Sequence, residues 1–187
     1  MPAMNRRTFL KLPLAAAAFT LDARADGPEG PGKPFGVKAR EDRFAEELLI
    51  MGGRFDCKVS GRDTGGELCI YDTIRGAKGG PALHRHHFQD EWFYVMRGDF
   101  IVKVGDATLS LHPGDSAFAP RRIPHAFAKV SEAEGQLLIV FQPAGSMEEF
   151  FKQMAKFGSA IPENQAAAFK GLWEQHGMEL LGPPLRF

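Results

Sequence analysis

The stretch HRHHFQDEWFYV, residues 84–95, decides how the chain is interpreted, because it places three of the six histidines directly before an apolar run. Successive side chains of a strand point to opposite faces, so His84 and His86 can converge on one point while His87 points away. Glu91 stands at an odd offset from His86 and would face the wrong side of one continuous strand. We therefore predict a bend in the three residues before Glu91 that turns its carboxylate back toward the two imidazoles.

Imidazoles combined with a carboxylate are ligands typical of a first-row transition-metal site. The alternative is a group of surface histidines beside a turn, which is the usual interpretation of a single histidine. His112 lies in a turn, and His176 lies near the end of an expected helix, where an imidazolium interacts favourably with the helix dipole. Neither is expected to be a ligand.

Short β-prone runs separated by turn signals continue after this stretch and also precede it. Pro113 and Gly114 match the central positions of a type II turn. Many short strands at this spacing predict an antiparallel sandwich or barrel over residues 54–143. The expected strands lie at residues 55–60, 67–74, 91–96, 99–104, 107–112, 116–120, 125–130 and 136–141.

Phenylalanine is abundant, with 16 of 187 residues against 2 Trp and 2 Tyr. By alternation, Phe93 and Val95 share the inward side with Glu91, and Phe127 shares it with His125. These apolar side chains can line a pocket for an apolar or aromatic ligand, or they can simply fill the barrel. Their positions in the sequence favour neither alternative.

The N-terminal segment, residues 1–25, has the pattern of a secretory signal with a cleavage site after Ala25. Its apolar stretch is too short to span a membrane as a mature helix. Arg6 and Arg7, followed by Thr-Phe-Leu-Lys, resemble a twin-arginine signal, although Asn5 stands where Ser or Thr is usual. We expect a periplasmic protein; the alternative is a buried N-terminal helix.

The charges are balanced, with 23 basic and 23 acidic residues. Cleavage after residue 25 removes four basic residues and one acidic residue, which leaves a net charge of −3. No basic stripe or tail is present, so we expect no nucleic-acid partner. No second apolar run reaches membrane length, so we expect a soluble protein with no membrane association after cleavage.

Two further segments flank the expected barrel. Residues 26–53 should form a linker and an N-terminal arm, with a short helix at residues 40–50. Residues 144–187 should be helical, with one helix at 147–157 and another at 162–176. Ser146-Met-Glu-Glu149 reads as a capping box for the first of these helices. We expect the apolar faces of both helices to pack against the barrel or a second subunit.

The run GGPALHRHHFQDEWFYVMRG resembles the first motif of the cupin superfamily. That motif is a glycine, His-x-His, three or four residues, a glutamate, six residues and a second glycine. His84, His86, Glu91 and Gly98 match it in type and spacing. The leading glycine, Gly79, stands one residue late.

The run GDSAFAPRRIPHAFAK resembles the second cupin motif. Gly114, Pro120 and His125 stand at the expected offsets. Arg122 replaces a glycine and Lys129 replaces an asparagine, but neither is a ligand position in the motif. Because both motifs occur in order, the resemblance is specific over roughly residues 54–143.

The resemblance implies an all-β fold, a cupin double-stranded β-helix or jelly-roll barrel, with the two C-terminal α-helices outside it. It also implies a homodimer, the common state in the family. It further implies a metal held by His84, His86, Glu91 and His125, with one or two open positions of the kind a catalytic site needs. In the family the carboxylate can also accept a proton from substrate, so Glu91 is the catalytic candidate.

Cupins with these motifs are similar to several enzyme types: quercetinase-like dioxygenases, isomerases, decarboxylases and lyases. We expect a dioxygenase-like oxidoreductase that acts on a small apolar or aromatic molecule. The alternatives are a non-catalytic cupin that binds a metal or a small molecule, and a cupin isomerase or lyase.

The cofactor should be one divalent transition metal. Mn or Fe is favoured, because proteins with a twin-arginine signal cross the membrane already folded and can keep a weakly bound metal acquired in the cytoplasm. Ni, Cu and Zn stay open. Cys57 and Cys69 could lie on neighbouring strands, and the periplasm permits a disulfide. Two small buried thiols are the alternative.

Overall fold

The computed structural model describes residues 33–158 and 163–187. The expected signal peptide and the first residues of the linker lie outside the described residues, so these two interpretations stay predictions. Among the described residues, none of the helices has the length and apolar character needed to span a membrane.

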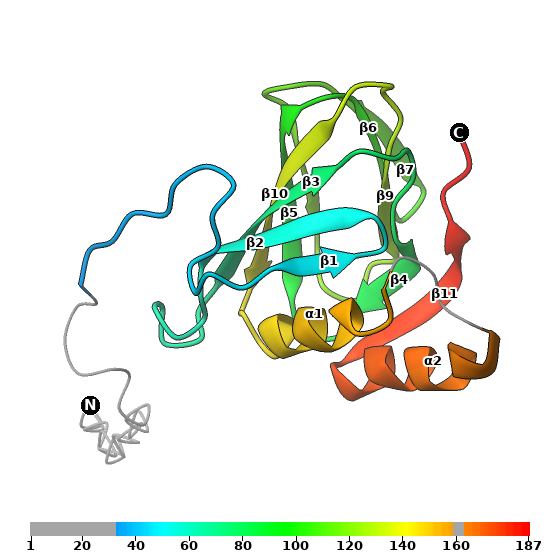
Figure 1. Cartoon of the computed structure of the whole chain (residues 1–187). Coiled ribbons are helices and arrows are strands. Elements are labelled where there is room, and N and C mark those ends of the chain that lie inside the picture. The colour runs from blue at the N-terminus through cyan, green and yellow to red at the C-terminus, as the bar shows by residue number, and fades with distance from the viewer. Residues whose placement is uncertain (1–32, 159–162) are drawn as a thin grey trace, which may run out of the picture.

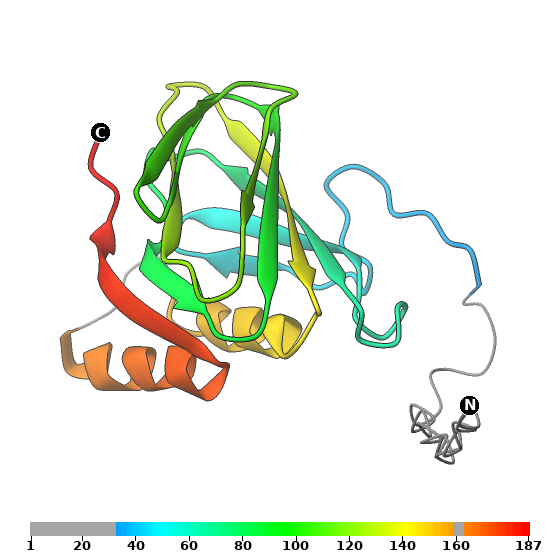
Figure 2. The same ribbon diagram turned by 180° about the vertical axis from the view of Figure 1, so that it is seen from behind.

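Two antiparallel sheets form a jelly-roll barrel, as predicted (Figure 1). The six-stranded sheet has the order β1 (Leu48–Ile50), β2 (Gly53–Val59), β3 (Cys69–Arg75), β10 (Gly135–Gln142), β5 (Asp90–Arg97) and β8 (Ser116–Ala119). The five-stranded sheet has the order β11 (Met178–Pro184), β4 (Ala82–His86), β9 (His125–Lys129), β6 (Phe100–Val104) and β7 (Ala107–Leu111). Figure 2 shows the barrel from behind, with the β6–β7 hairpin facing the viewer.

Alternation along β5 explains how this strand separates core from surface. Phe93 and Val95 are fully buried, whereas Trp92 and Met96 are exposed on the other side of the strand. β10 pairs with β5 along its length, and its buried residues alternate in the same way. Because successive side chains alternate between the two faces of a strand, one continuous apolar face of this sheet lies inside the barrel.

The turn that Pro113 and Gly114 predict lies between β7 and β8. Gly114 has a φ of +96°, the left-handed value that the third residue of a type II turn requires. The Asp115 carboxylate accepts the backbone N–H of His112 at 2.8 Å, which fixes the start of the turn. His112 lies at this turn, as expected, and its side chain is exposed.

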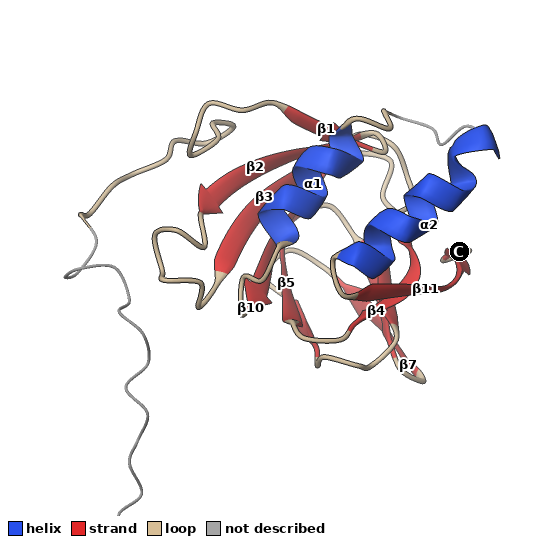
Figure 3. Cartoon of the chain, turned by 90° about the horizontal axis from the view of Figure 1, so that it is seen from below, coloured by secondary structure: helices blue, strands red, loops and turns tan. Residues whose placement is uncertain are grey.

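Two C-terminal helices lie side by side across one end of the barrel (Figure 3). They are α1 (Met147–Ala155) and α2 (Ala166–Gln175), and a 3-10 turn at Glu163–Gln165 precedes the second. Both expected helices are present, the first two residues shorter than predicted. The start of the second at residue 162 lies outside the described residues. The apolar side of α1 enters the core through Met147, Phe150, Phe151 and Met154.

The predicted capping box is wrong, because both of its side chains bond elsewhere. Ser146 is the N-cap of α1 but makes no side-chain capping bond. Its Oγ instead lies 2.8 Å from Nδ1 of His176, the C-cap of α2, so this pair joins the two helices. Glu149 accepts from Gln153, four residues later on the same helix.

The predicted helix at residues 40–50 is also wrong. The Asp42 carboxylate accepts the backbone N–H of Phe44 at 2.7 Å and that of Cys57, on β2, at 2.6 Å. These bonds hold a turn against the sheet and compete with helix formation. Leu48 and Ile50 then alternate inward as β1, which pairs with β2 through a tight hairpin.

Strand β11 is the element that the sequence analysis missed. It contains Gly182 and two prolines, which usually argue against a strand. It lies at the edge of the five-stranded sheet, where only one side needs hydrogen bonds, and it pairs with β4 from Met178 opposite His86 onward. The chain therefore returns to the barrel after α2 and covers the strand that carries the histidines.

Cys57 and Cys69 lie on the neighbouring strands β2 and β3, but they are free thiols rather than a disulfide. Both are buried. Burial is the main cause that raises the pKa of Cys57 to about 12, so this thiol stays protonated and packs as a small apolar side chain.

Phe151 should contribute strongly to stability, because its ring packs against Phe55, Tyr71 and Phe141 from three different strands. We predict that Phe151→Ala lowers the free energy of unfolding by about 3–5 kcal/mol, as measured by urea denaturation. The control is Phe118→Ala on β8, where the ring is 56% exposed; it should change stability by less than about 0.5 kcal/mol. Equal effects would contradict the role of α1 as part of the core.

Candidate metal centre

Three strands from both sheets bring the predicted ligands together. β4 supplies His84 and His86, β5 supplies Glu91, and β9 supplies His125. His84 and His125 are directly opposite each other in the antiparallel pair of β4 and β9. All four side chains are buried, and one ligand atom from each lies within 4.8 Å of those of the others.

The bend predicted before Glu91 is present between β4 and β5. Directly before Glu91, the Asp90 carboxylate accepts three bonds from Arg121, one from its backbone N–H and two from its guanidinium, at 2.6–3.0 Å. The hydrogen bonds with Arg121 are also the main cause that lowers the pKa of Asp90. These bonds hold the start of β5, so the Glu91 carboxylate points back to the histidines.

The distances within the cluster fit a shared ion. Oε2 of Glu91 lies 2.8 Å from Nε2 of His125, 3.2 Å from Nε2 of His86 and 4.0 Å from Nε2 of His84. Ligands held at about 2.0–2.2 Å from one metal are necessarily about 3–4.4 Å apart. The three separations therefore lie close to what a single bound ion requires.

Backbone carbonyls orient two of the imidazoles. Nδ1 of His84 lies 2.8 Å from the carbonyl oxygen of Ala82, and Nδ1 of His125 lies 2.9 Å from that of Ile123. These contacts assign the N–H to Nδ1 in each ring and leave Nε2 directed at the cluster. Such a second contact is what a metal-binding histidine usually makes with its other nitrogen.

His86 supplies the observation that most directly indicates a cation-binding site. Its side chain is 1% exposed, and neither ring nitrogen has a hydrogen-bond partner among the described residues. Its ring stacks on that of His125, with centroids 5.3 Å apart. A buried imidazole without hydrogen-bond partners is costly, and a cation bound at Nε2 would satisfy that nitrogen.

The charges in the cluster also favour a cation. Burial, followed by repulsion from His125 and His86, lowers the pKa of His84 to about 3, so its ring is neutral. Burial raises the pKa of Glu91, but contacts with His125 and His86 outweigh burial and hold it well below its ordinary value. Glu91 is therefore a carboxylate that faces the Nε2 lone pair of His84. The residues present fit a divalent metal, and His84, His86, Glu91 and His125 would hold it.

The other histidines lie away from the cluster. His87 is half-exposed, with Nε2 3.9 Å from the Glu179 carboxylate on the other side of β4. His112 pairs with Asp99 at the surface. His176 is buried between the two helices.

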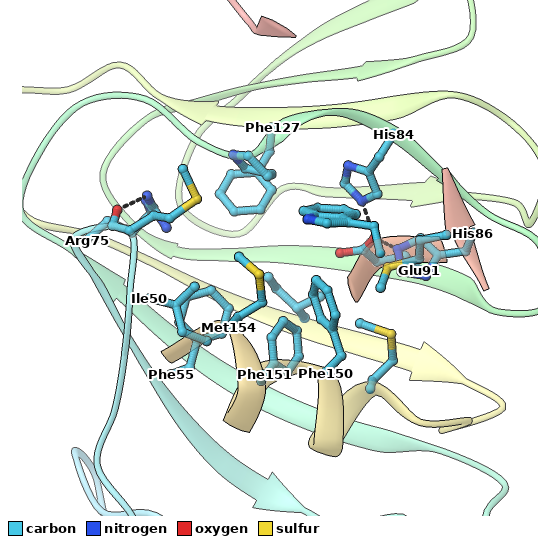
Figure 4. A pocket seen from close by; sticks show the side chains of 16 residues that line it. Ile50, Phe55, Arg75, His84, His86, Glu91, Phe127, Phe150, Phe151 and Met154 are labelled. Atoms are coloured by element: carbon cyan, nitrogen blue, oxygen red, sulfur yellow. Dashed lines mark hydrogen bonds and ion pairs between the residues drawn. The ribbon is translucent and has the colours of Figure 1, made fainter. Parts of the chain in front are cut away.

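A cavity of about 60 Å³ adjoins the cluster and has 16 lining residues, most of them apolar (Figure 4). Phe127 lines this cavity, whereas Phe93 and Val95 fill the core. Phe150, Phe151 and Trp173 bring aromatic rings from the helices, and the Trp173 ring contacts that of His84 at 4.8 Å between centroids. The helices thus form one wall of the cavity.

Arg75 is the lining residue that the sequence analysis missed. It ends β3, where Cys69, Tyr71 and Thr73 take the inward phase of alternation. Arg75 occupies the next inward position, and a charged residue there could have been recognised from the sequence as a candidate functional residue.

Comparison with known proteins shows a resemblance of the segment that carries the site to one family. Residues 73–141 match the family described as "Cupin domain", and this segment includes all four clustered residues. This part of the barrel therefore resembles a cupin domain.

Several solved structures resemble the chain over just over half of its length. An RmlC-like cupin from Shewanella frigidimarina is 26% identical, with 57% of this chain and 93% of that chain covered and a TM-score of 0.43. A predicted oxalate decarboxylase from Thermotoga maritima is 15% identical, with 52% and 90% covered and a TM-score of 0.48. A sugar phosphate isomerase from Silicibacter pomeroyi is 21% identical, with 57% and 77% covered and a TM-score of 0.45. No curated protein matches the chain.

The two departures from the second cupin motif have structural explanations. Arg122, in place of a glycine, takes a left-handed φ of +68° and donates its backbone N–H to the His86 carbonyl at 2.7 Å. The loop therefore keeps a backbone conformation that glycine adopts readily. Lys129, in place of an asparagine, is fully buried, and its Nζ donates to the carbonyls of Gly76 and Ser131. It ties loops together away from the cluster.

We predict that His86→Ala lowers the bound divalent metal from about one equivalent to less than a tenth, because it removes a buried ligand. The matched control is His87→Ala, which changes the adjacent imidazole outside the cluster and should keep full metal content. Elemental analysis after gel filtration measures both variants. Equal metal content in the two variants would rule out the assignment of His86 as a ligand.

Proposed function

We propose that this cupin is a metal-dependent oxidoreductase of the dioxygenase type that acts on a small molecule with an apolar or aromatic body. The observation that carries the proposal is that three members of the His₃Glu cluster, His84, His86 and Glu91, line a largely apolar, aromatic cavity. Four protein ligands leave open positions on a five- or six-coordinate metal, as catalysis requires.

A redox-active divalent metal would supply a Lewis acid for a substrate hydroxyl and an electron donor for dioxygen chemistry. Mn or Fe is the favoured metal, and Ni or Cu are the alternatives for this chemistry. Zn has no redox chemistry and would fit only a non-oxidative function. The chain's own residues would bind the substrate and exclude water. The aromatic wall formed by Phe127, Phe150 and Trp173 would hold an apolar body by contact and exclude bulk water.

Glu91 is the group that would accept the substrate proton. Its Oε2 atom faces all three imidazoles, so a hydroxyl that enters the cluster meets this oxygen. The contacts of Glu91 with His125 and His86 make it a weak base at rest. It would become effective when substrate displaces one of these contacts and the carboxylate rotates.

We predict that Glu91→Gln keeps at least part of the metal but loses about 10²–10⁴-fold in turnover, because the amide cannot accept the proton. The assay is oxygen consumption by Mn- or Fe-loaded protein with a panel of phenols and enols, together with metal analysis. Glu179→Gln is the control, because that carboxylate pairs with Arg85 on β4 outside the cluster. Full activity with full metal content in Glu91→Gln would refute the role of Glu91.

The same assay separates the alternatives. Turnover of a panel compound without oxygen consumption would indicate an isomerase or lyase. Binding of a compound with no turnover at all would indicate a cupin that only binds metals or small molecules. Either result would overturn the dioxygenase proposal while leaving the metal centre in place.

We also propose that the protein is exported to the periplasm by the twin-arginine route, on the basis of Arg6 and Arg7. Export in the folded state would let the site keep Mn or Fe acquired in the cytoplasm.

We predict that changing both Arg6 and Arg7 to Lys traps the precursor in the cytoplasm, because the twin-arginine machinery reads the paired guanidinium groups. Cell fractionation followed by immunoblotting measures the distribution. Normal export of this variant, or normal export of the natural chain in cells that lack the twin-arginine translocase, would show that the general secretory route is used instead.

A further inference from the structure

Arg75 is a buried charge that the metal centre does not use. It is the last residue of β3, its side chain lines the cavity, and it is only 7% exposed. Burial lowers the pKa of its guanidinium, yet arginine remains charged at neutral pH. A buried charge of this kind is normally paired with an opposite charge.

No carboxylate lies within 4.0 Å of the Arg75 guanidinium in the described part of the chain. Nη2 donates to the carbonyl of Met51 at 2.9 Å, whereas Nε is buried and has no hydrogen-bond partner among the described residues. The guanidinium thus keeps donor capacity and an uncompensated charge. Both would be satisfied by an anion in the cavity.

The β1–β2 hairpin is shaped around this guanidinium. Gly53 is opposite Arg75 in the β2–β3 pair, and a Cβ at Gly53 would lie only 2.7 Å from Nη1. Met51, a residue without glycine's freedom, has a left-handed φ of +46° in the hairpin turn, and its carbonyl accepts the bond from Arg75. Strained residues of this kind are common beside ligand sites.

Arg75 and the metal ligands lie at opposite ends of the cavity, with Phe127 between them (Figure 4). The Arg75 guanidinium carbon is 5.9 Å from the centroid of the Phe127 ring. Phe127 follows the ligand His125 by two residues along β9, a rise of about 6.6 Å. The guanidinium and the cluster are therefore on the order of 10 Å apart.

The Arg75 end of the cavity is also the end nearer to solvent. Met51 and Pro81 are the lining residues that are only half-buried, and Arg75 bonds to Met51 directly. A ligand that enters on this side would meet the guanidinium first and then pass along the aromatic rings toward the cluster.

We propose that Arg75 binds the carboxylate of a small aromatic acid whose other polar group reaches the metal centre. This inference rests on the proposed function, because it names the substrate class of the same site. A carboxylate matches the planar fork of a guanidinium. A phosphate dianion is disfavoured, because Arg75 is the sole cationic side chain among the lining residues other than the histidines, and most of the others are apolar.

The test uses 3-(4-hydroxyphenyl)propanoate and its neutral amide as probes, because the acid places a phenol and a carboxylate at opposite ends of one ring. Calorimetry measures the binding of both probes to Mn-loaded protein without oxygen, so that no turnover occurs. We expect the natural chain to bind the acid at least about tenfold more tightly than the amide, as a charge-assisted bond implies. Equal affinities, or no binding of either probe, would overturn the proposal.

Variants then test whether Arg75 causes the preference for the acid over the amide. Arg75→Met should bind acid and amide equally, whereas Arg75→Lys should retain part of the preference, because it keeps the charge without the fork. Arg97→Met is the control, because that guanidinium lies at the surface and pairs with Glu134; it should leave the preference unchanged. A full preference for the acid in Arg75→Met would assign the carboxylate to another group and overturn the proposal. If Arg75→Met fails to fold, the test rests on Arg75→Lys, whose preference for the acid over the amide should be smaller than that of the natural chain.

A failure of the proposed metal centre can be distinguished from a failure of the proposed carboxylate site. Metal analysis of each variant reports on the cluster, and Arg75→Met should retain its full metal content. The same calorimetry on metal-free protein isolates the Arg75 end of the cavity. A natural chain that binds no metal but still prefers the acid would refute the proposed function and retain the carboxylate site.

Discussion

The structure depends on one constraint: a buried carboxylate, Glu91, faces three buried imidazoles inside an apolar barrel. Water cannot stabilise this charge at 4% exposure, so the protein must do so. A bound divalent cation would satisfy the carboxylate and the orphaned Nε2 of His86 together. Because the ligands come from three strands, the cation would also join the two sheets, so that metal binding and folding stabilise each other.

The cavity extends this arrangement into a site with two polar ends. One end holds the cluster and the other holds Arg75, while aromatic rings line the space between them. Electrostatic interactions are strengthened in a space with such an apolar lining. A ligand with polar groups at both ends would therefore be fixed in one orientation. The helices make this possible, since Phe150, Phe151 and Trp173 close an end of the barrel that the strands leave open.

Local rules predicted most of the barrel strands and part of the cluster. Alternation placed His84 and His86 together and required the bend before Glu91, but His125 came only from the resemblance, because spacing along one strand says nothing about a ligand on another. The errors have one cause: long-range partners compete with local patterns. The Ser146 side chain bonds His176 instead of capping its own helix. The Asp42 carboxylate bonds the backbone of Cys57, and the helix predicted at residues 40–50 does not form. The alternation along the strand could have predicted that Arg75 points inward. It could not have predicted that no carboxylate pairs with its guanidinium.

The most direct test of the account is a crystal structure of the protein grown with Mn(II), with anomalous diffraction used to locate the metal. We predict one fully occupied Mn(II) bound by Nε2 of His84, His86 and His125 and by the Glu91 carboxylate, with one or two positions left for water or substrate. A Mn(II) located elsewhere, or a cluster that stays empty at saturating Mn(II) while all four side chains keep their positions, would contradict it.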